Sequence, residues 1–405
     1  MKKIFLTLAA TSLLLTGQAM ATNADQMLGV SAQQWARGGA IVAAPVDAPS
    51  VLFNPAAAGA LDITTIAFDL GAGLLHAERS ISNPMISTDS DSENYFALGA
   101  GLITKVSDKA FFSIAAGGVA GLGTDFAQTL APNAATAVVT TKGLLKFQPT
   151  FTYNPMENLS LGASVQIGYQ TLALSNAKMD MPQTGEFGMG ASIGAIYKLS
   201  PMWQLGASYV SEMDISEYSF HGSYDKDGMM ANFASTPGTY LFDMNAPATA
   251  AFGVAFTPMP KLLIEADVKW VGFSSVMDAI DLKDSAGRTL ETIAFGWEDQ
   301  WVYSIGTDFS VTENIILRAG YNYGATGIDP EDVQYNLGAV AVVEHHLSLG
   351  VSRKWTSVPG MMGTLSYTRG FENSVTGNVP TPGGMVPHTL EASQDILYFQ
   401  LSYAL

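Results

Sequence analysis

The carboxy-terminal residues alternate between apolar and polar side chains. From Leu397 to Leu405 every second residue is large and apolar, and the residues between them are polar or amphipathic. A period of two is the period of a β-strand, whose successive side chains point to opposite faces of the sheet. The pattern therefore predicts a strand with one apolar face and one face suited to water. A final strand of this kind is what an outer-membrane β-barrel needs in order to close.

The same alternation recurs in segments that are long enough to cross a membrane as tilted strands, which takes about 9 to 11 residues. Short connections rich in turn-forming residues alternate with long polar ones, as expected for periplasmic turns and outer loops. We predict an all-β fold, a 14-stranded antiparallel transmembrane β-barrel over residues 62–405. The expected strands are 62–75, 93–105, 109–123, 143–154, 158–173, 185–199, 202–220, 247–257, 261–275, 297–309, 314–324, 344–355, 361–371 and 392–405.

Charged residues indicate which face of a strand points into the barrel. Glu265, Asp267 and Lys269 share one face of their strand, and apolar residues occupy the other face. Arg318 lies in a similar inward row. A basic residue that faces lipid at the bilayer midplane costs about 2 to 4 kcal/mol, so we expect these charged faces to line the lumen.

The amino terminus predicts export. Residues 1–3 are basic, residues 4–15 are largely apolar, and residues 19–21 have the small-x-small form of a signal-peptidase site. We therefore expect residues 1–21 to be a signal peptide. No other run reaches the roughly 18 apolar residues of a membrane helix, although 48% of the chain is hydrophobic and only 14% is charged. An exported, apolar chain without membrane helices favours a barrel.

Charge and residue types exclude several functions. The formal net charge of −17 argues against nucleic acid as a partner. The acidic residues either form solvated loop charge, the favoured interpretation, or bind divalent cations at the lipopolysaccharide layer. Adjacent His345 and His346 point to opposite faces of a strand and cannot share one metal ion by themselves. We expect no metal and no cofactor, and the absence of cysteine decides little.

Residues 22–61 precede the first expected strand and do not alternate. This segment is rich in small residues and carries little charge. A barrel of fourteen strands is wide enough to leave a lumen. The segment either fills that lumen as a hatch or forms a disordered periplasmic arm, and its many Ala and Val residues favour burial.

Several stretches resemble one family of outer-membrane proteins. The run Trp35–Ala40, followed by Asp47 and Val51–Ala56, resembles the amino-terminal hatch of the long-chain fatty acid transporters of the FadL type and their aromatic-hydrocarbon relatives. The resemblance implies a hatch motif at Asn54, Pro55 and Ala56. It extends through barrel segments to the last strand, at Pro247–Ser274, Trp297–Tyr321 and Glu344–Gly350.

The resemblance also implies a lateral exit for substrates. In this family the third strand is kinked inward and leaves a gap in the barrel wall. The matching strand, Phe111–Thr124, carries the expected lateral-gate residues Gly117, Gly118, Gly121 and Gly123. Glycines weaken a strand and permit a bend, but they would also permit tight packing against the hatch. Both interpretations place the hatch beside this strand.

The function implied by the resemblance is passive transport of hydrophobic compounds, with long-chain fatty acids as the leading substrate and aromatic or alkane hydrocarbons as the alternative. The candidate apolar contacts are Met229, Met230, Phe233 and Phe242. The inward Lys269 and Arg318 either pair with a substrate carboxylate or, as the favoured alternative, balance the inward acidic residues in a wet lumen.

Other function classes are less well supported. A lipase would need a serine beside a histidine with an orienting partner, and the five histidines offer no such arrangement, so we expect no enzyme. A general porin is disfavoured by the hatch-like segment. We expect a monomer whose partners are a hydrophobic small molecule, outer-membrane lipid and lipopolysaccharide. The barrel-assembly machinery would act during biogenesis, although the chain ends in Leu405 where the family usually has an aromatic residue.

Overall fold

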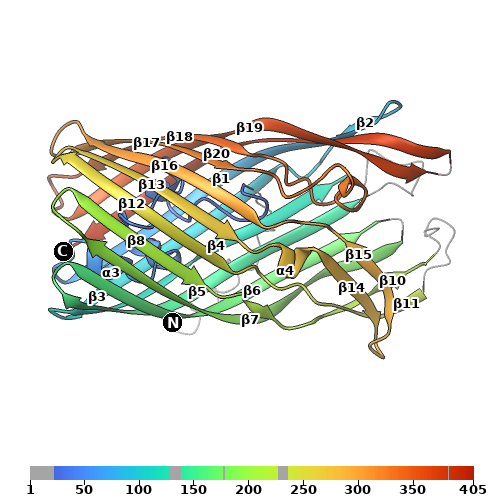
Figure 1. Cartoon of the computed structure of the whole chain (residues 1–405), viewed down its shortest axis with the longest axis horizontal. Coiled ribbons are helices and arrows are strands. Elements are labelled where there is room, and N and C mark those ends of the chain that lie inside the picture. The colour runs from blue at the N-terminus through green and yellow to red at the C-terminus, as the bar shows by residue number, and fades with distance from the viewer. Residues whose placement is uncertain (1–21, 127–137, 177, 227–235, 382) are drawn as a thin grey trace.

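The computed structural model describes residues 22–126, 138–176, 178–226, 236–381 and 383–405, so the expected signal peptide lies outside the described residues. The strands form one antiparallel sheet that closes on itself, because β1 (Ile66–Ser82) pairs with both β3 (Asn94–Ser107) and β20 (Gly384–Ala404). Figure 1 shows the strands running at a tilt along the long axis of the molecule. Among the described helices, none is long and apolar enough to span a membrane.

Within the described part of the chain, fourteen strands pair in a closed ring and form the wall, which confirms the predicted barrel. Each of them overlaps one of the fourteen segments expected from the sequence. The wall is completed, between β3 and β20, by β4 (Ala110–Asp125), β5 (Val139–Met156), β6 (Leu159–Ser175), β7 (Met179–Lys198), β8 (Trp203–Val210), β12 (Thr249–Met259), β13 (Leu262–Val271), β16 (Gln300–Ser310), β17 (Ile315–Gly324), β18 (His345–Lys354) and β19 (Met361–Thr381).

At one end of the barrel the sheet continues beyond the ring as hairpins (Figure 1). The sequence predicts loops at 221–246, 276–296 and 372–391, whereas much of these three segments is strand. Outside lipid the outward face of a hairpin contacts water while its inward face is buried, as for Tyr218 and Phe220, so the apolar outer face that marks a membrane strand is absent. The additional elements are β2 (Ser87–Asp89), β9 (Asp214–Ile215), β10 (Tyr218–Tyr224), β11 (Thr236–Phe242), α4 (Ser274–Met277), β14 (Ala279–Asp284) and β15 (Thr289–Ala294).

Polar side chains face the lumen and apolar side chains face outward. On β18 the exposed fraction is 45% for Leu347 and 55% for Leu349, whereas the alternating residues His346 and Ser348 are fully buried. Glu265 on β13 is likewise fully buried and inward. The face assignment made from the charged residues is therefore correct on these strands.

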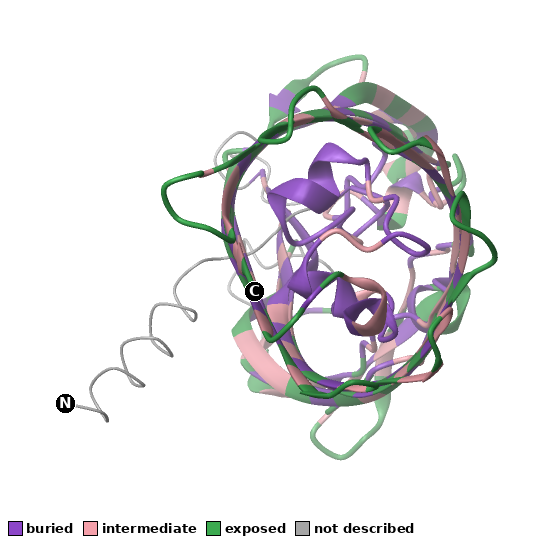
Figure 2. Ribbon diagram, turned by 90° about the vertical axis from the view of Figure 1, so that its left-hand side faces the viewer, coloured by how far each residue is buried: buried purple, intermediate pink, exposed green. Residues whose placement is uncertain are grey.

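Residues 22–61, here called the amino-terminal segment, lie inside the ring. Figure 2, viewed along the barrel, shows buried helices surrounded by the wall. These are α2 (Ala32–Ala36), η1 (Ala48–Leu52) and α3 (Ala57–Ala60). The start of α2 follows from the sequence, because the side chain of Ser31 accepts a hydrogen bond from the Gln34 backbone N–H, as a helix N-cap does.

The connection between β17 and β18, residues 325–344, also turns into the lumen. The sequence analysis expected an outer loop here, but the apolar run Ala339–Val343 is buried. A short helix, η4 (Val333–Tyr335), lies within the connection. The side chain of Asn336 accepts a hydrogen bond from the Trp297 indole N–H at 2.7 Å and donates to the Phe295 carbonyl oxygen at 2.7 Å. The lumen is therefore filled from both ends.

Candidate functional site

Two carboxylates on the inner face of β13 bind the backbone of the amino-terminal segment. Asp267 Oδ2 accepts hydrogen bonds from the N–H groups of Ile41 and Val42 at 2.7 and 3.0 Å. Glu265 Oε1 accepts hydrogen bonds from Ala43 and Ala44 at 2.6 and 2.9 Å. Buried N–H groups need partners, and here side chains of the wall supply them to four consecutive residues.

A buried ion-pair network completes this attachment. Arg37 pairs with Glu265, and its Nε lies 3.6 Å from Asp308. Burial alone lowers the pKa of Arg37, but the carboxylates of Asp308 and Glu265 outweigh it and the net pKa is raised, so the guanidinium stays charged. Arg318 lies 3.2 Å from Asp308 and donates to Gln33 at 2.8 Å. Arg318, considered from the sequence as a substrate contact, therefore contacts the amino-terminal segment.

The motif Asn54–Ala56 is docked on the inner faces of β5 and β6. Thr152 donates a hydrogen bond to the Pro55 carbonyl oxygen at 2.7 Å, and Ser160 donates to that of Ala56 at 2.7 Å. Asn54 is fully buried, and its Oδ1 accepts a hydrogen bond from the Ala56 N–H at 3.0 Å. The motif thus fixes the end of the amino-terminal segment against the wall.

Two glycines of the wall make room for this motif. A Cβ atom at Gly194 on β7 would overlap Oδ1 of Asn54, and one at Gly162 on β6 would overlap the Pro55 carbonyl group. Neither position can accept a side chain while the motif stays in place. Absence of a Cβ is therefore a requirement of docking at these two positions.

Strand β4 bends into the lumen at its glycines. It pairs with β3 only from Ala110 to Gly117, and its pairing with β5 is irregular between Gly118 and Ala120. Every residue from 117 to 124, which includes Gly121 and Gly123, is buried, whereas a regular wall strand has alternate residues exposed. Residues 94–98 of β3 remain paired with β1, but they have no partner residues in β4. The two strands thus diverge and leave a gap in the wall.

The start of the amino-terminal segment lies along the open edge of β4. The Met27 N–H donates to the Val119 carbonyl oxygen at 3.0 Å, and the Gly121 N–H donates to the Asp25 carbonyl oxygen at 2.8 Å. The side chain of Asp25 also pairs with Lys142 of β5 at 2.7 Å, and both groups are buried. Residues 25–27 therefore cover the gap from the inside, in the manner of a short extra strand.

A central cavity borders this cover. Its lining includes Met27 and Leu28 of the cover, Phe53 of the amino-terminal segment, and Val119 and Leu144 of the wall. Most of these side chains are apolar, so the cavity offers a hydrophobic surface beside the gap. The cavity therefore lies where a molecule leaving sideways would start.

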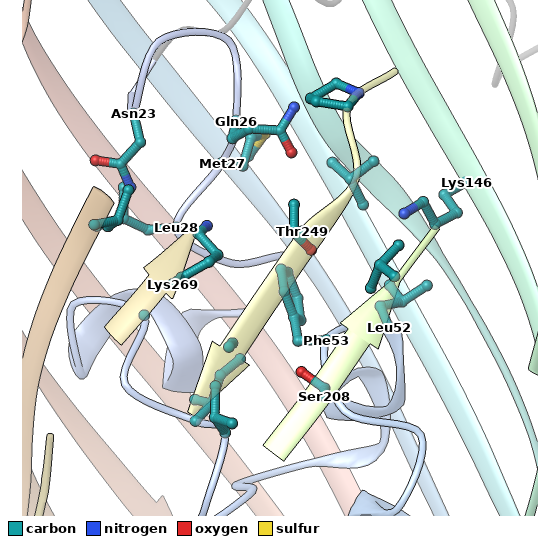
Figure 3. Close-up of a pocket in the computed structure, with 18 of the residues that line it drawn as sticks. Asn23, Gln26, Met27, Leu28, Leu52, Phe53, Lys146, Ser208, Thr249 and Lys269 are labelled. Atoms are coloured by element: carbon teal, nitrogen blue, oxygen red, sulfur yellow. The ribbon is translucent and has the colours of Figure 1, made fainter. Parts of the chain in front are cut away.

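Two lysines enter this cavity from different strands (Figure 3). Lys146 comes from β5 and Lys269 from β13. Among the described residues, no carboxylate oxygen lies within 4 Å of either ammonium group. Lys269 was expected as a candidate, whereas Lys146 was not considered. Lys146 could have been found from its even spacing with Lys142 and Gln148, which places all three on the inward face of β5.

Phe242, the remaining described candidate, lies outside the central cavity. It is fully buried in an apolar cluster at the outer end of the lumen, together with Tyr218, Phe220, Met244 and Met277. A second cavity adjoins this cluster at Met244 and Met277. Met229, Met230 and Phe233 lie outside the described residues.

Comparison with known proteins supports this architecture. A family model described as "Outer membrane protein transport protein (OMPP1/FadL/TodX)" matches residues 12–337. Among the curated proteins, none matches the chain.

Several solved structures share the fold. A FadL homologue from Pseudomonas aeruginosa is 16% identical, with 94% of this chain and 99% of that chain covered and a TM-score of 0.80. The toluene transporter TodX from Pseudomonas putida is 17% identical, with 95% and 100% covered and a TM-score of 0.75. The toluene transporter TbuX from Ralstonia pickettii is 16% identical, with 93% and 98% covered and a TM-score of 0.70. At these identities the likeness shows the fold alone.

The attachment to β13 predicts a leak when it is removed. Glu265→Leu removes one of the two carboxylates that pair with Arg37 and leaves two buried backbone N–H groups without their partner, a loss of about 3 to 5 kcal/mol. We expect the amino-terminal segment to loosen and single-channel conductance in planar bilayers to rise above that of the wild type. Glu372→Leu, at an exposed position on β19, is the matched control. Conductance equal to the wild type in a folded Glu265→Leu protein would contradict this role.

The glycine at position 194 predicts a docking defect. Gly194→Ala forces Asn54 to move and loses hydrogen bonds worth about 1 kcal/mol each, so it should lower uptake of hydrophobic substrates as Asn54→Leu does. Assembly of the barrel should persist, as judged by heat-modifiable migration in gels. Gly238→Ala is the control, because the nearest atoms to a Cβ there are at 3.4 Å, an ordinary contact. Normal uptake by both test variants would exclude the proposed importance of the motif.

Proposed function

The chain belongs to the OMPP1/FadL/TodX family of outer membrane transport proteins, and from that premise we propose that its substrates are long-chain fatty acids. It is a transport protein of the bacterial outer membrane for hydrophobic compounds and not an enzyme. One observation carries the choice of substrate: Lys146 and Lys269 line a cavity of mixed apolar and polar side chains, and although Asp267 also lines it, no carboxylate oxygen among the described residues lies within 4 Å of either ammonium group.

The acyl chain of a fatty acid matches the apolar side chains of this cavity, and its carboxylate matches the two lysines. Each CH₂ group that leaves water for an apolar surface contributes about 0.8 kcal/mol, and the carboxylate would pair with the lysines. A buried ammonium group without a partner is unfavourable, and a neutral hydrocarbon would leave both lysines in that state. The cavity therefore favours the acid over aromatic or alkane hydrocarbons.

The proposed route runs from the outer apolar cluster through the central cavity to the gap beside β4. A water-filled pore would give an acyl chain no gain from burial, whereas this route keeps it against apolar side chains. The amino-terminal segment acts as the hatch that blocks passage straight through the lumen. Residues 25–27 must leave β4 for the substrate to reach lipid. One closed barrel holds the whole route, so the proposed transport unit is a monomer.

If Lys146 and Lys269 bind the substrate carboxylate, replacing either lysine should weaken the binding of the acid but not that of its methyl ester. Lys146→Gln and Lys269→Gln each remove one charge-assisted hydrogen bond, worth about 1.5 to 3 kcal/mol, so each should weaken hexadecanoate binding at least tenfold. Binding of methyl hexadecanoate, which has no charge, should change little. Isothermal titration calorimetry on the purified protein measures both. Lys198→Gln, at an exposed position, is the control. Equal losses for acid and ester, or no loss for either, would overturn carboxylate recognition.

If substrates leave through the gap beside β4, a disulfide that holds residues 25–27 on β4 should block transport reversibly. Gln26 and Ala120 face each other as a non-hydrogen-bonded antiparallel pair, a geometry with Cα atoms about 4.5 Å apart that suits a disulfide. The variant Gln26→Cys/Ala120→Cys should stop fatty acid uptake when oxidised and restore it on reduction. The chain has no other cysteine to interfere.

A matched disulfide serves as the control for that experiment. Thr376 and Thr389 are opposed on β19 and β20, with hydroxyl oxygens 2.8 Å apart. The variant Thr376→Cys/Thr389→Cys joins strands that are already paired and should transport in both redox states. Full uptake by the oxidised Gln26→Cys/Ala120→Cys protein would rule out exit beside β4.

A further inference from the structure

The central cavity contains a buried amide that has no partner for either of its polar atoms. Gln166 of β6 is fully buried and lines the cavity, and neither Oε1 nor Nε2 makes a hydrogen bond within the described residues. The large majority of buried polar side-chain atoms have a partner. A glutamine with both its donor and its acceptor unpaired is therefore a position where a ligand group can bind.

A second amide repeats this arrangement elsewhere in the cavity lining. Asn23 is fully buried and lines the cavity, and its Oδ1 and Nδ2 are also unpaired within the described residues. Its backbone is held in place, because the Asn23 N–H donates to the Gln26 carbonyl oxygen at 3.0 Å. In Figure 3, Asn23 and Lys269 lie on the left of the view and Lys146 lies on the right.

Gln166 lies close to one of the lysines. Lys146 pairs with Gly168 across β5 and β6, and Gln166 is two residues farther along β6 on the same inward face. Diagonal neighbours of this kind are about 7 to 8 Å apart and within reach of long side chains. One molecule can therefore contact the ammonium group and the amide at the same time.

We propose that the preferred substrates are hydroxylated long-chain fatty acids, with the carboxylate at the lysines and a chain hydroxyl hydrogen-bonded to Gln166. This inference rests on the proposed function and adds a second recognition point to it. A hydroxyl group both donates and accepts a hydrogen bond, so it pairs with Oε1 and Nε2 of the amide together. A second carboxylate only accepts, and a methylene group does neither. An unsubstituted acyl chain would leave the buried amide unpaired.

The test compares four ligands of equal chain length on the purified full-length protein. These are hexadecanoic acid, its 3-hydroxy and 10-hydroxy derivatives, and hexadecanedioic acid. We expect at least one hydroxy acid to bind about tenfold more tightly than hexadecanoic acid, as two net hydrogen bonds allow. Gln166→Leu should remove this preference, so that the hydroxy acid and hexadecanoic acid bind this variant about equally.

A glutamine four residues along the same strand provides the matched control. Gln170 is also buried on β6, but its Nε2 donates to the Met244 carbonyl oxygen at 2.9 Å and it does not line the central cavity. Gln170→Leu should therefore keep the preference for the hydroxy acid. The ligand series on the wild-type protein decides the question even if a variant fails to assemble.

The possible outcomes distinguish a failure of the hydroxyl proposal from a failure of the proposed fatty acid transport. Binding of hexadecanoic acid with equal or weaker binding of both hydroxy acids would overturn the hydroxyl proposal and leave fatty acid transport standing. Tightest binding of hexadecanedioic acid would overturn it in favour of a second carboxylate. No binding of any acid would overturn the proposed function, and this inference with it. A preference that survives in Gln166→Leu would show that Gln166 is not the group that reads the hydroxyl.

Discussion

The carboxylates of Glu265 and Asp267 are engaged by the amino-terminal segment, and much of the structure depends on this. A lumen filled with protein leaves buried backbone N–H groups without water, so the wall has to supply their partners. Four N–H groups and Arg37 bind three of the four carboxylate oxygens, and Asp267 Oδ1 makes no hydrogen bond within the described residues. Lys269 lies two positions along the same strand face from Asp267, yet no carboxylate oxygen among the described residues lies within 4 Å of its ammonium group. Within the described residues Lys269 therefore forms no ion pair, although Asp267 also lines the cavity.

The same segment also covers the gap in the wall. Residues 25–27 lie along β4, residues 41–44 are bound to β13, and Asn54 docks near β7. The residues that cover the gap, the residues that bind β13 and part of the cavity lining all belong to the amino-terminal segment, which is about 40 residues long. In the proposed account, a change that loosens the attachment also affects the cavity and access to the gap. The glycines of β4 matter because only a bent strand leaves an edge for this chain to cover.

The wall could be predicted from the sequence because lipid imposes a strong contrast between the two faces of each strand. The outer hairpins could not, because their outward face contacts water and the apolar outer face of a membrane strand is absent there. The buried run Ala339–Val343 carried an apolar signal that alternation did not capture. Arg318 was assigned to the correct face, but its partners Gln33 and Asp308 come from distant parts of the chain and depend on the closed barrel. The inward orientation of Lys146 could have been predicted from the alternation of side chains along its strand. The absence of a carboxylate near its ammonium group could not.

The most direct test of the account is a crystal structure of the protein with a bromine-labelled long-chain fatty acid, located by the anomalous signal of bromine. The account predicts that the carboxylate lies within hydrogen-bonding distance of Lys146 or Lys269 and that the acyl chain lies against Met27, Phe53 and Leu144. An acid bound elsewhere in the barrel, with both lysines unchanged and unliganded at saturation, would contradict it.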